Sequence, residues 1–130
     1  MKQIILLAII SVAIAFANIA TSKYERAKRI AVEEADRFGI SVSTDRIGET
    51  VIVKFSVSSQ FPCKLDAVSV ATFERSHAIL SALIEPRNGV YQIQALEGYL
   101  ERTRIDFFCV SGQTGPALYI LDLSGLKKNA

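Results

Sequence analysis

The residues of this 130-residue chain best suited to catalysis or metal binding are two cysteines, Cys63 and Cys109, and a single histidine, His77. Metal sites and nucleophilic sites are usually built from several such side chains at short, regular spacings such as CxxC or HxxxH. Neither spacing occurs here, and His77 lies in the segment ERSHA, which we expect to form a turn. We therefore expect no catalytic residue, no metal site and no cofactor, and we interpret the chain as a non-enzymatic protein.

A second short segment, VSGQTGP, combines Ser111 with turn-forming residues. It differs from the GxSxG nucleophile elbow, and no Lys-Ser or Lys-Thr follows its glycines as in a phosphate-binding loop. We expect it to connect two strands. Because loops at the end of a β domain can vary without disturbing the core, four residues of this segment form a candidate recognition loop: Gly112, Gln113, Thr114 and Gly115.

The composition predicts one small globular domain. Hydrophobic residues make up 50% of the chain, which is enough to bury a core. Its 15 basic and 13 acidic side chains give a net charge of +2. A nucleic-acid-binding domain usually shows a concentrated basic patch, so we expect no nucleic-acid partner.

The first 21 residues have the composition of a signal peptide or a membrane anchor. Residues 4–17, IILLAIISVAIAFA, carry no charge and follow Lys2, and the sequence Ala-Phe-Ala at 15–17 is typical of a cleavage site. The apolar run reaches Ala20 and so meets the lower length limit for crossing a bilayer. We favour an anchor that contacts the membrane through residues 4–20, and the alternative is cleavage after Ala17. The basic residues that follow the run would favour an inverted topology.

Residues 22–39 carry the pattern of an amphipathic helix. Ser22 and Glu25 fit a capping box at its start, and Gly39 is placed to end it. One face of this helix is small or aromatic and is a candidate packing surface for a sheet or a partner helix: Tyr24, Ala27, Ala31, Ala35 and Phe38.

From residue 40 the hydrophobic period changes from that of a helix to that of a strand. Strands are expected within residues 40–44, 51–57, 66–74, 90–96, 103–111 and 117–123, and residues 125–130 form a short tail. Residues 78–85, AILSALIE, suit a strand or a helix. A strand there gives a β-sandwich over residues 40–124, whereas a helix within residues 65–85 gives an α+β fold. We favour the sandwich.

The strand pattern of residues 40–123 resembles an immunoglobulin-like or fibronectin type III-like β-sandwich in its architecture. Trp is absent from the third strand, and Cys63 precedes that strand, so the antibody-type pattern is missing. The resemblance implies a binding or structural module. In such a sandwich the third and sixth strands are neighbours, which implies a bridge between Cys63 and Cys109 worth about 2–4 kcal/mol. The alternative is two unpaired, buried thiols.

The order of an apolar run, an amphipathic helix and a β domain is also similar to that of a type IV pilin. The run lacks the Gly-Phe processing site and the Glu five residues into the run that mark pilins. A pilin-like filament subunit is therefore a minor alternative.

These features together predict a membrane-tethered accessory or binding subunit. We expect its β-sandwich to lie outside the cytoplasm, in the periplasm or at the cell surface, and to contact protein partners such as subunits of a membrane complex. The alternative is a secreted module, cut after Ala17, that binds a protein or a glycan.

Overall fold

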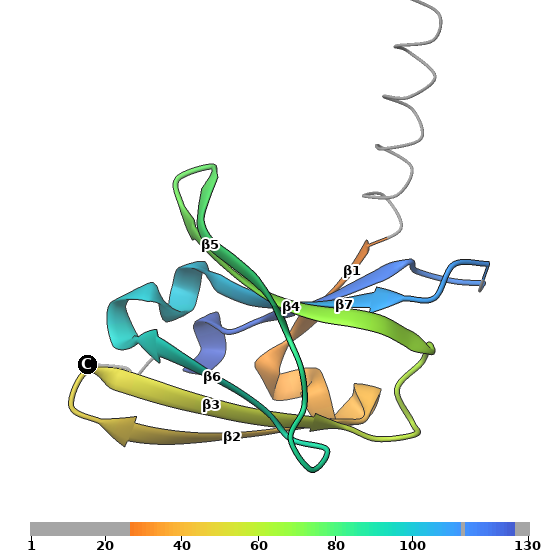
Figure 1. Ribbon diagram of the computed structural model, residues 1–130, viewed down its shortest axis with the longest axis horizontal. Coiled ribbons are helices and arrows are strands. Elements are labelled where there is room, and N and C mark those ends of the chain that lie inside the picture. The colour runs from red at the N-terminus through yellow and green to blue at the C-terminus, as the bar shows by residue number, and fades with distance from the viewer. Residues whose placement is uncertain (1–26, 113, 127–130) are drawn as a thin grey trace, which may run out of the picture.

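The structure is a computed structural model, and it describes residues 27–112 and 114–126. In this part the chain is mainly β, with two sheets and three short 3-10 helices (Figure 1). Its elements, in chain order, are β1 (Ala27–Ala31), η1 (Val32–Phe38), β2 (Ile40–Ile47), β3 (Thr50–Val57), β4 (Leu65–Glu74), β5 (His77–Ile84), β6 (Tyr91–Leu96), η2 (Glu97–Arg102), β7 (Thr103–Cys109), β8 (Leu118–Asp122) and η3 (Ser124–Leu126).

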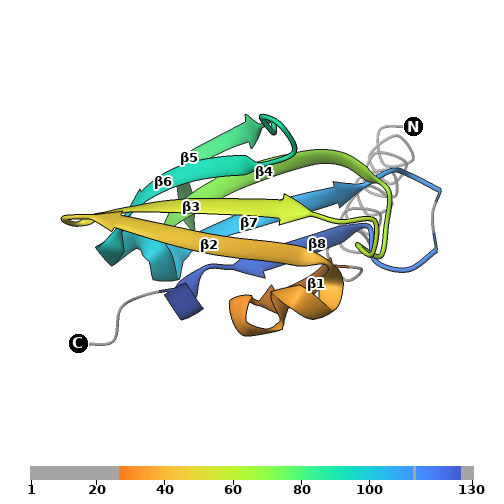
Figure 2. The ribbon, with the colours of Figure 1, turned by 90° about the horizontal axis from the view of Figure 1, so that it is seen from below.

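The two sheets differ in size. The larger one has five strands in the order β1-β8-β7-β4-β5, and the smaller one has three in the order β2-β3-β6 (Figure 2). All neighbouring pairs are antiparallel except β1 and β8, which are parallel. The mainly β character predicted from the sequence is confirmed, and the arrangement is consistent with the expected β-sandwich.

The core contains side chains from both sheets. The rings of Phe55 on β3 and Phe107 on β7 meet edge to face, with centroids 5.8 Å apart. Phe61, in the loop after β3, packs against Phe107 and against Tyr119 of β8. Such aromatic contacts add to the stabilisation that comes from burying the rings. The alternation in β3 explains why this strand was easily predicted, since its residues Val51, Val53 and Phe55 are buried.

Residues 77–84 form the strand β5, so the α+β alternative with a helix within residues 65–85 is wrong. The chain reverses at Arg75, whose φ of +57° lies in the left-handed region, and β5 returns antiparallel to β4. Helix propensity differs by only a few tenths of a kcal/mol among most residues of this segment. Cross-strand pairing of β5 with β4, which is interrupted by an irregularity at Ile79, outweighs it.

The amphipathic helix predicted over residues 22–39 is wrong for residues 27–38. Ala27–Ala31 forms β1, which pairs with β8, and the next seven residues form the 3-10 helix η1. Pairing with β8 buries Ile30 completely, and the helical pattern had no place for this residue in the packing face. The predicted end of the segment is confirmed, because Gly39 takes a φ of +75° and donates its N–H to the Asp36 carbonyl.

The helix packing face is therefore also wrong. Ala27 and Ala31 lie on the strand β1. Ala35 is the buried residue of η1, and Phe38, the last residue of η1, packs against the ring of Tyr119. Tyr24 and the capping box lie outside the described residues. The pilin-like layout depended on this helix, and β1 removes that support.

The larger sheet begins before residue 40, because β1 is one of its strands. The segments predicted as an anchor or signal peptide and residues 127–130 of the tail lie outside the described residues, whereas Gly125 and Leu126 belong to η3. Over residues 27–112 and 114–126, no helix has the length and apolar character needed to cross a bilayer.

Candidate interaction surface

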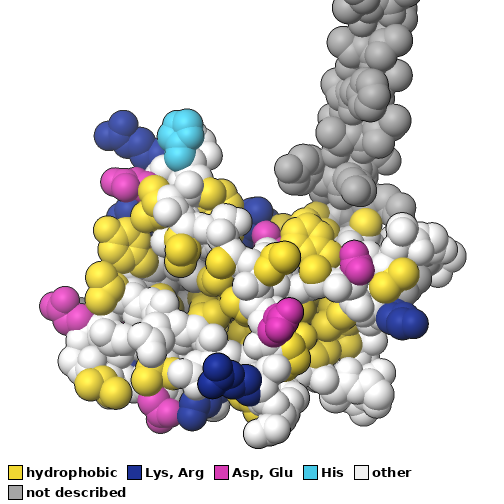
Figure 3. Space-filling view, viewed as in Figure 1, with side chains coloured by type: hydrophobic (Ala, Val, Ile, Leu, Met, Phe, Trp, Pro, Cys, Tyr) yellow, Lys and Arg dark blue, Asp and Glu magenta, His cyan; other side chains and the backbone are white. Residues whose placement is uncertain are grey.

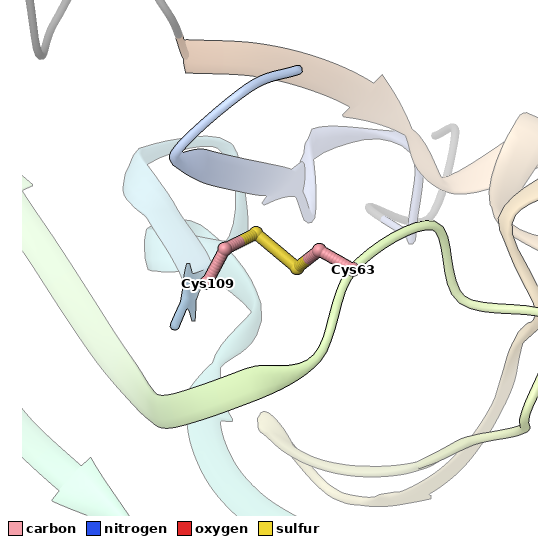
Figure 4. Close-up of a disulfide and its surroundings, with 2 residues drawn as sticks. All are labelled: Cys63 and Cys109. Carbon is pink, nitrogen blue, oxygen red and sulfur yellow. A yellow bond between two sulfur atoms is a disulfide. The ribbon is translucent and has the colours of Figure 1, made fainter. Parts of the chain in front are cut away.

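Cys63 and Cys109 form a disulfide, with their Cα atoms 5.8 Å apart (Figure 4). Cys63 comes from the loop before β4, and Cys109 is the last residue of β7. The Val110 N–H donates to the Lys64 carbonyl beside the bridge, so the two segments are joined by the backbone as well. The predicted bridge is confirmed.

The candidate recognition loop follows the disulfide. Gly112 and Gly115 have φ values of +87° and +91°, and a Cβ on either would meet nothing within 4 Å. Thr114 is exposed, and Gln113 lies outside the described residues. A side chain at either glycine would find open space, but the positive φ would strain any other residue there.

This loop lies at the end of the domain where the described chain begins. Phe108 of β7 pairs with Leu118 of β8, and Leu118 is the register partner of Ala27. The loop joins β7 to β8 at this same end. Its position relative to Ala27 therefore depends directly on the register of β1, which the sequence did not predict.

His77 is the first residue of β5, next to the predicted turn, and its side chain is exposed. Figure 3 shows the histidine at the tip of the hairpin, with Lys or Arg and hydrophobic side chains nearby. In the described part of the chain, no three His, Cys, Asp or Glu side chains are grouped to hold a metal ion.

The most unusual surface is the free side of β5, which we call the β5 edge (residues 78–84). Among the strands of residues 27–112 and 114–126, β5 is the last in its sheet and pairs with β4 alone. Its residues Ile79, Leu80 and Leu83 are 51%, 50% and 74% exposed. Residues 78–84, AILSALI, contain no charged residue. The β5 edge is therefore an apolar strand with one row of backbone groups unpaired in the described structure.

The other three edge strands in the described part carry the polar side chains that usually protect sheet edges. These are Lys28 and Arg29 on β1, Asp45 and Arg46 on β2, and Gln92 and Gln94 on β6. On the β5 edge the only polar side chain is Ser81. Exposed apolar edges without such protection pair readily with another strand.

Charges stand only at the two ends of β5. Glu74 and Arg75 precede it at the hairpin, and Glu85 follows it.

One buried carboxylate lies on the outer face of the larger sheet. Asp106 on β7 is 5% exposed, and Nε of Arg104 lies 3.1 Å from its Oδ1. Burial raises the pKa of Asp106, and the nearby Arg104 and Arg29 oppose this shift. Its register partner on β4 is the buried Ser69.

Comparison of the chain with protein-family models, with curated proteins and with solved structures gave no match.

The sequence did not identify the β5 edge as a surface. The lack of charge in residues 78–84 was visible, but the same segment fitted a buried strand or a helix. The strand order of the structure places β5 at the end of its sheet and so shows that this charge-free segment is an exposed edge.

Proposed function

We propose that the chain is a non-enzymatic accessory or binding subunit, tethered to a membrane by residues 4–20, whose β domain lies outside the cytoplasm. The β5 edge carries this proposal. It accepts an extended, apolar segment of a partner protein as an additional strand of the larger sheet, through main-chain hydrogen bonds and contacts to alternate side chains.

The sheet order supports this arrangement. β1, which leads back toward the proposed anchor, is at one side of the larger sheet, and β5 is at the other. The six residues between Ala20 and Ala27 reach at most about 25 Å when extended. The end of the domain with Ala27, the disulfide and the Gly112–Gly115 loop would then face the membrane, and the β5 edge would stay accessible along the opposite side.

The disulfide supports a location outside the cytoplasm. Disulfides form and persist mainly in oxidising compartments such as the periplasm and the cell surface. The same reasoning applies to the secreted alternative cut after Ala17.

We further propose that the fold is of the immunoglobulin or fibronectin type III kind, preceded by β1. Lettered in chain order as A, B, C, C′, E, F and G, strands β2 to β8 give an A-B-E sheet and a G-F-C-C′ sheet. Immunoglobulin domains place the same letters together, apart from strand D. This type of fold commonly serves as a binding module, which agrees with the proposed function by analogy.

Substitution on the β5 edge tests the proposed contact. The full chain is extracted from membranes in mild detergent, and co-purifying proteins are identified by mass. Leu83→Lys should remove a specific partner, because a lysine on an apolar edge opposes strand addition. Ile47→Lys is the matched control, since Ile47 is 69% exposed on the β2 edge. Equal recovery of every partner with both variants would contradict the proposal.

Intact-mass measurement of the same material tests the tether. A chain that retains residues 1–17 supports the anchor, and a chain that begins at Asn18 rules it out in favour of the secreted alternative.

A further inference from the structure

A second feature lies on the outer face of the larger sheet, at the end away from Ala27. It is a pocket of about 320 Å³, which we call the arginine pocket. Four arginines line it, one each from β1, the β4–β5 turn, η2 and β7, together with one aromatic residue, one threonine and two carboxylates: Arg29, Arg75, Arg102, Arg104, Phe73, Thr103, Glu101 and Asp122.

Two of these arginines are held against aromatic rings. The Arg104 Cζ lies 4.6 Å from the centre of the Phe73 ring, and the Arg102 Cζ lies 5.7 Å from the centre of the Tyr99 ring. Stacking on a ring restrains a guanidinium and leaves its N–H groups directed around the ring edge. Less conformational entropy is therefore lost when the two groups bind a ligand.

The backbone next to Arg102 is held by hydrogen bonds to Thr103 and the core. The Thr103 hydroxyl donates to the Tyr99 carbonyl at 2.7 Å, so the Thr72 hydroxyl, 2.9 Å away, must be the donor to Thr103. This chain of hydrogen bonds joins η2 to β4 inside the core. The backbone between Tyr99 and Arg102 is thus held in place next to the pocket.

The charges in the pocket are not balanced. Arg29 pairs with Asp122 at 3.7 Å, and Arg104 uses its Nε toward Asp106. Among the described residues, the side chains of Arg75 and Arg102 form no ion pair, and Arg102 lies against the Tyr99 ring. With Arg29 paired to Asp122 and Arg104 to Asp106, Arg75 and Arg102 remain, and Glu101 is the other carboxylate in the pocket lining.

We propose that the arginine pocket binds the phosphate group of a small phosphorylated ligand. Guanidinium groups recognise phosphate oxygens through paired, charge-assisted hydrogen bonds, and the two arginines without an ion pair, Arg75 and Arg102, exceed the needs of a single carboxylate. A pocket of this volume suits a small ligand rather than a large cofactor. Apart from Arg29 of β1, the lining residues of β7 and β8 lie at the end of these strands away from Ala27. This step rests on the proposed tether: with the Ala27 end at the membrane, we infer a dissolved ligand and not a lipid headgroup.

Calorimetric titration of the full chain in detergent tests this site, with inorganic phosphate and pyrophosphate as probes at constant ionic strength. We expect saturable binding that Arg102→Gln and Arg75→Gln each weaken about tenfold, the effect of losing one charge-assisted contact. Arg87→Gln is the matched control, because Arg87 is exposed in the β5–β6 connection outside the pocket. All three side chains are on the surface, and thermal unfolding checks that each variant is folded.

Three results would overturn the assignment. They are no saturable binding of either probe, equal weakening by Arg87→Gln and the two pocket variants, and binding to vesicles containing phosphatidic acid without binding to dissolved phosphate. The last result would assign the pocket to a lipid headgroup.

Discussion

The hydroxyl oxygens of Thr72 and Thr103 lie 2.9 Å apart across β4 and β7, inside the core. Thr103 also donates to the backbone of η2 at Tyr99, so one side chain connects a strand pair to the helical turn beside the arginine pocket.

Thr103→Val should lower the free energy of unfolding by about 1–3 kcal/mol, because it leaves the Thr72 hydroxyl and the Tyr99 carbonyl without their partner. Thr72→Val keeps the bond from Thr103 to Tyr99 and should cost less. Urea unfolding of both variants measures the difference. Equal costs for the two would show that the hydrogen bond to η2 contributes nothing measurable.

Gly39 provides a test of the η1–β2 junction. A Cβ there would lie 2.9 Å from the Phe61 backbone nitrogen and 2.6 Å from the Ser58 hydroxyl. Gly48, with a φ of +61° and open space around it, carries the backbone strain without the clash. We expect Gly48→Ala to cost about 1 kcal/mol, and Gly39→Ala to cost at least about 2 kcal/mol more. The midpoints of thermal unfolding compare the two, and similar losses would contradict the packing around Gly39.

The disulfide should contribute about 2–4 kcal/mol, since it joins residues 46 apart in the sequence. Reduction should lower the urea midpoint of the wild-type protein to that of the double variant Cys63→Ala/Cys109→Ala. The double variant itself should not respond to the reductant. Native protein whose thiols react fully with an alkylating reagent before reduction would contradict the bridge.

Asp106 gives the protein a pH dependence of known sign. Because burial raises its pKa in the folded state, the folded chain holds this proton more tightly than the unfolded chain does. The stabilisation of the folded state that comes from protonated Asp106 is therefore fully present below about pH 4, near the ordinary pKa of aspartate. It is lost as the pH rises through the raised pKa. The Asp106→Asn variant should lack this pH-dependent contribution to the free energy of unfolding.

The measurement is the free energy of unfolding from pH 4 to pH 7 for the wild type and for Asp106→Asn. The difference, wild type minus variant, should decrease with rising pH and then level off. A difference that increases over this range would mean that Arg104 outweighs the burial of Asp106.

The strand content of the domain could be predicted because the side chains record it directly. In β3 the residues alternate between core and solvent, so Val51, Val53 and Phe55 revealed both the strand and its buried face. The pairing of Cys63 with Cys109 followed from the expected adjacency of two strands, and the register of Leu65 with Cys109 accounts for it.

The edges of the sheets could not be predicted, because they depend on pairings between distant segments. Residues 27–31 have a helical pattern in isolation, and only parallel pairing with β8 makes them a strand. Residues 78–84 carry no charge, but their sequence does not show that the strand they form lies at the edge of the described sheet. The arginine pocket combines residues of β1, the β4–β5 hairpin, η2, β7 and β8 that lie up to 93 positions apart, and no spacing in the sequence joins them.

The central claim is that a protein partner binds along the β5 edge, and a photoreactive amino acid at position 83 tests it most directly. The same probe at position 47 is the control, because Ile47 is similarly exposed on a polar edge. In intact cells, irradiation should join the chain probed at Leu83 to one discrete protein, and the probe at Ile47 should give no such product. No adduct at position 83, or the same adducts at both positions, would contradict the account.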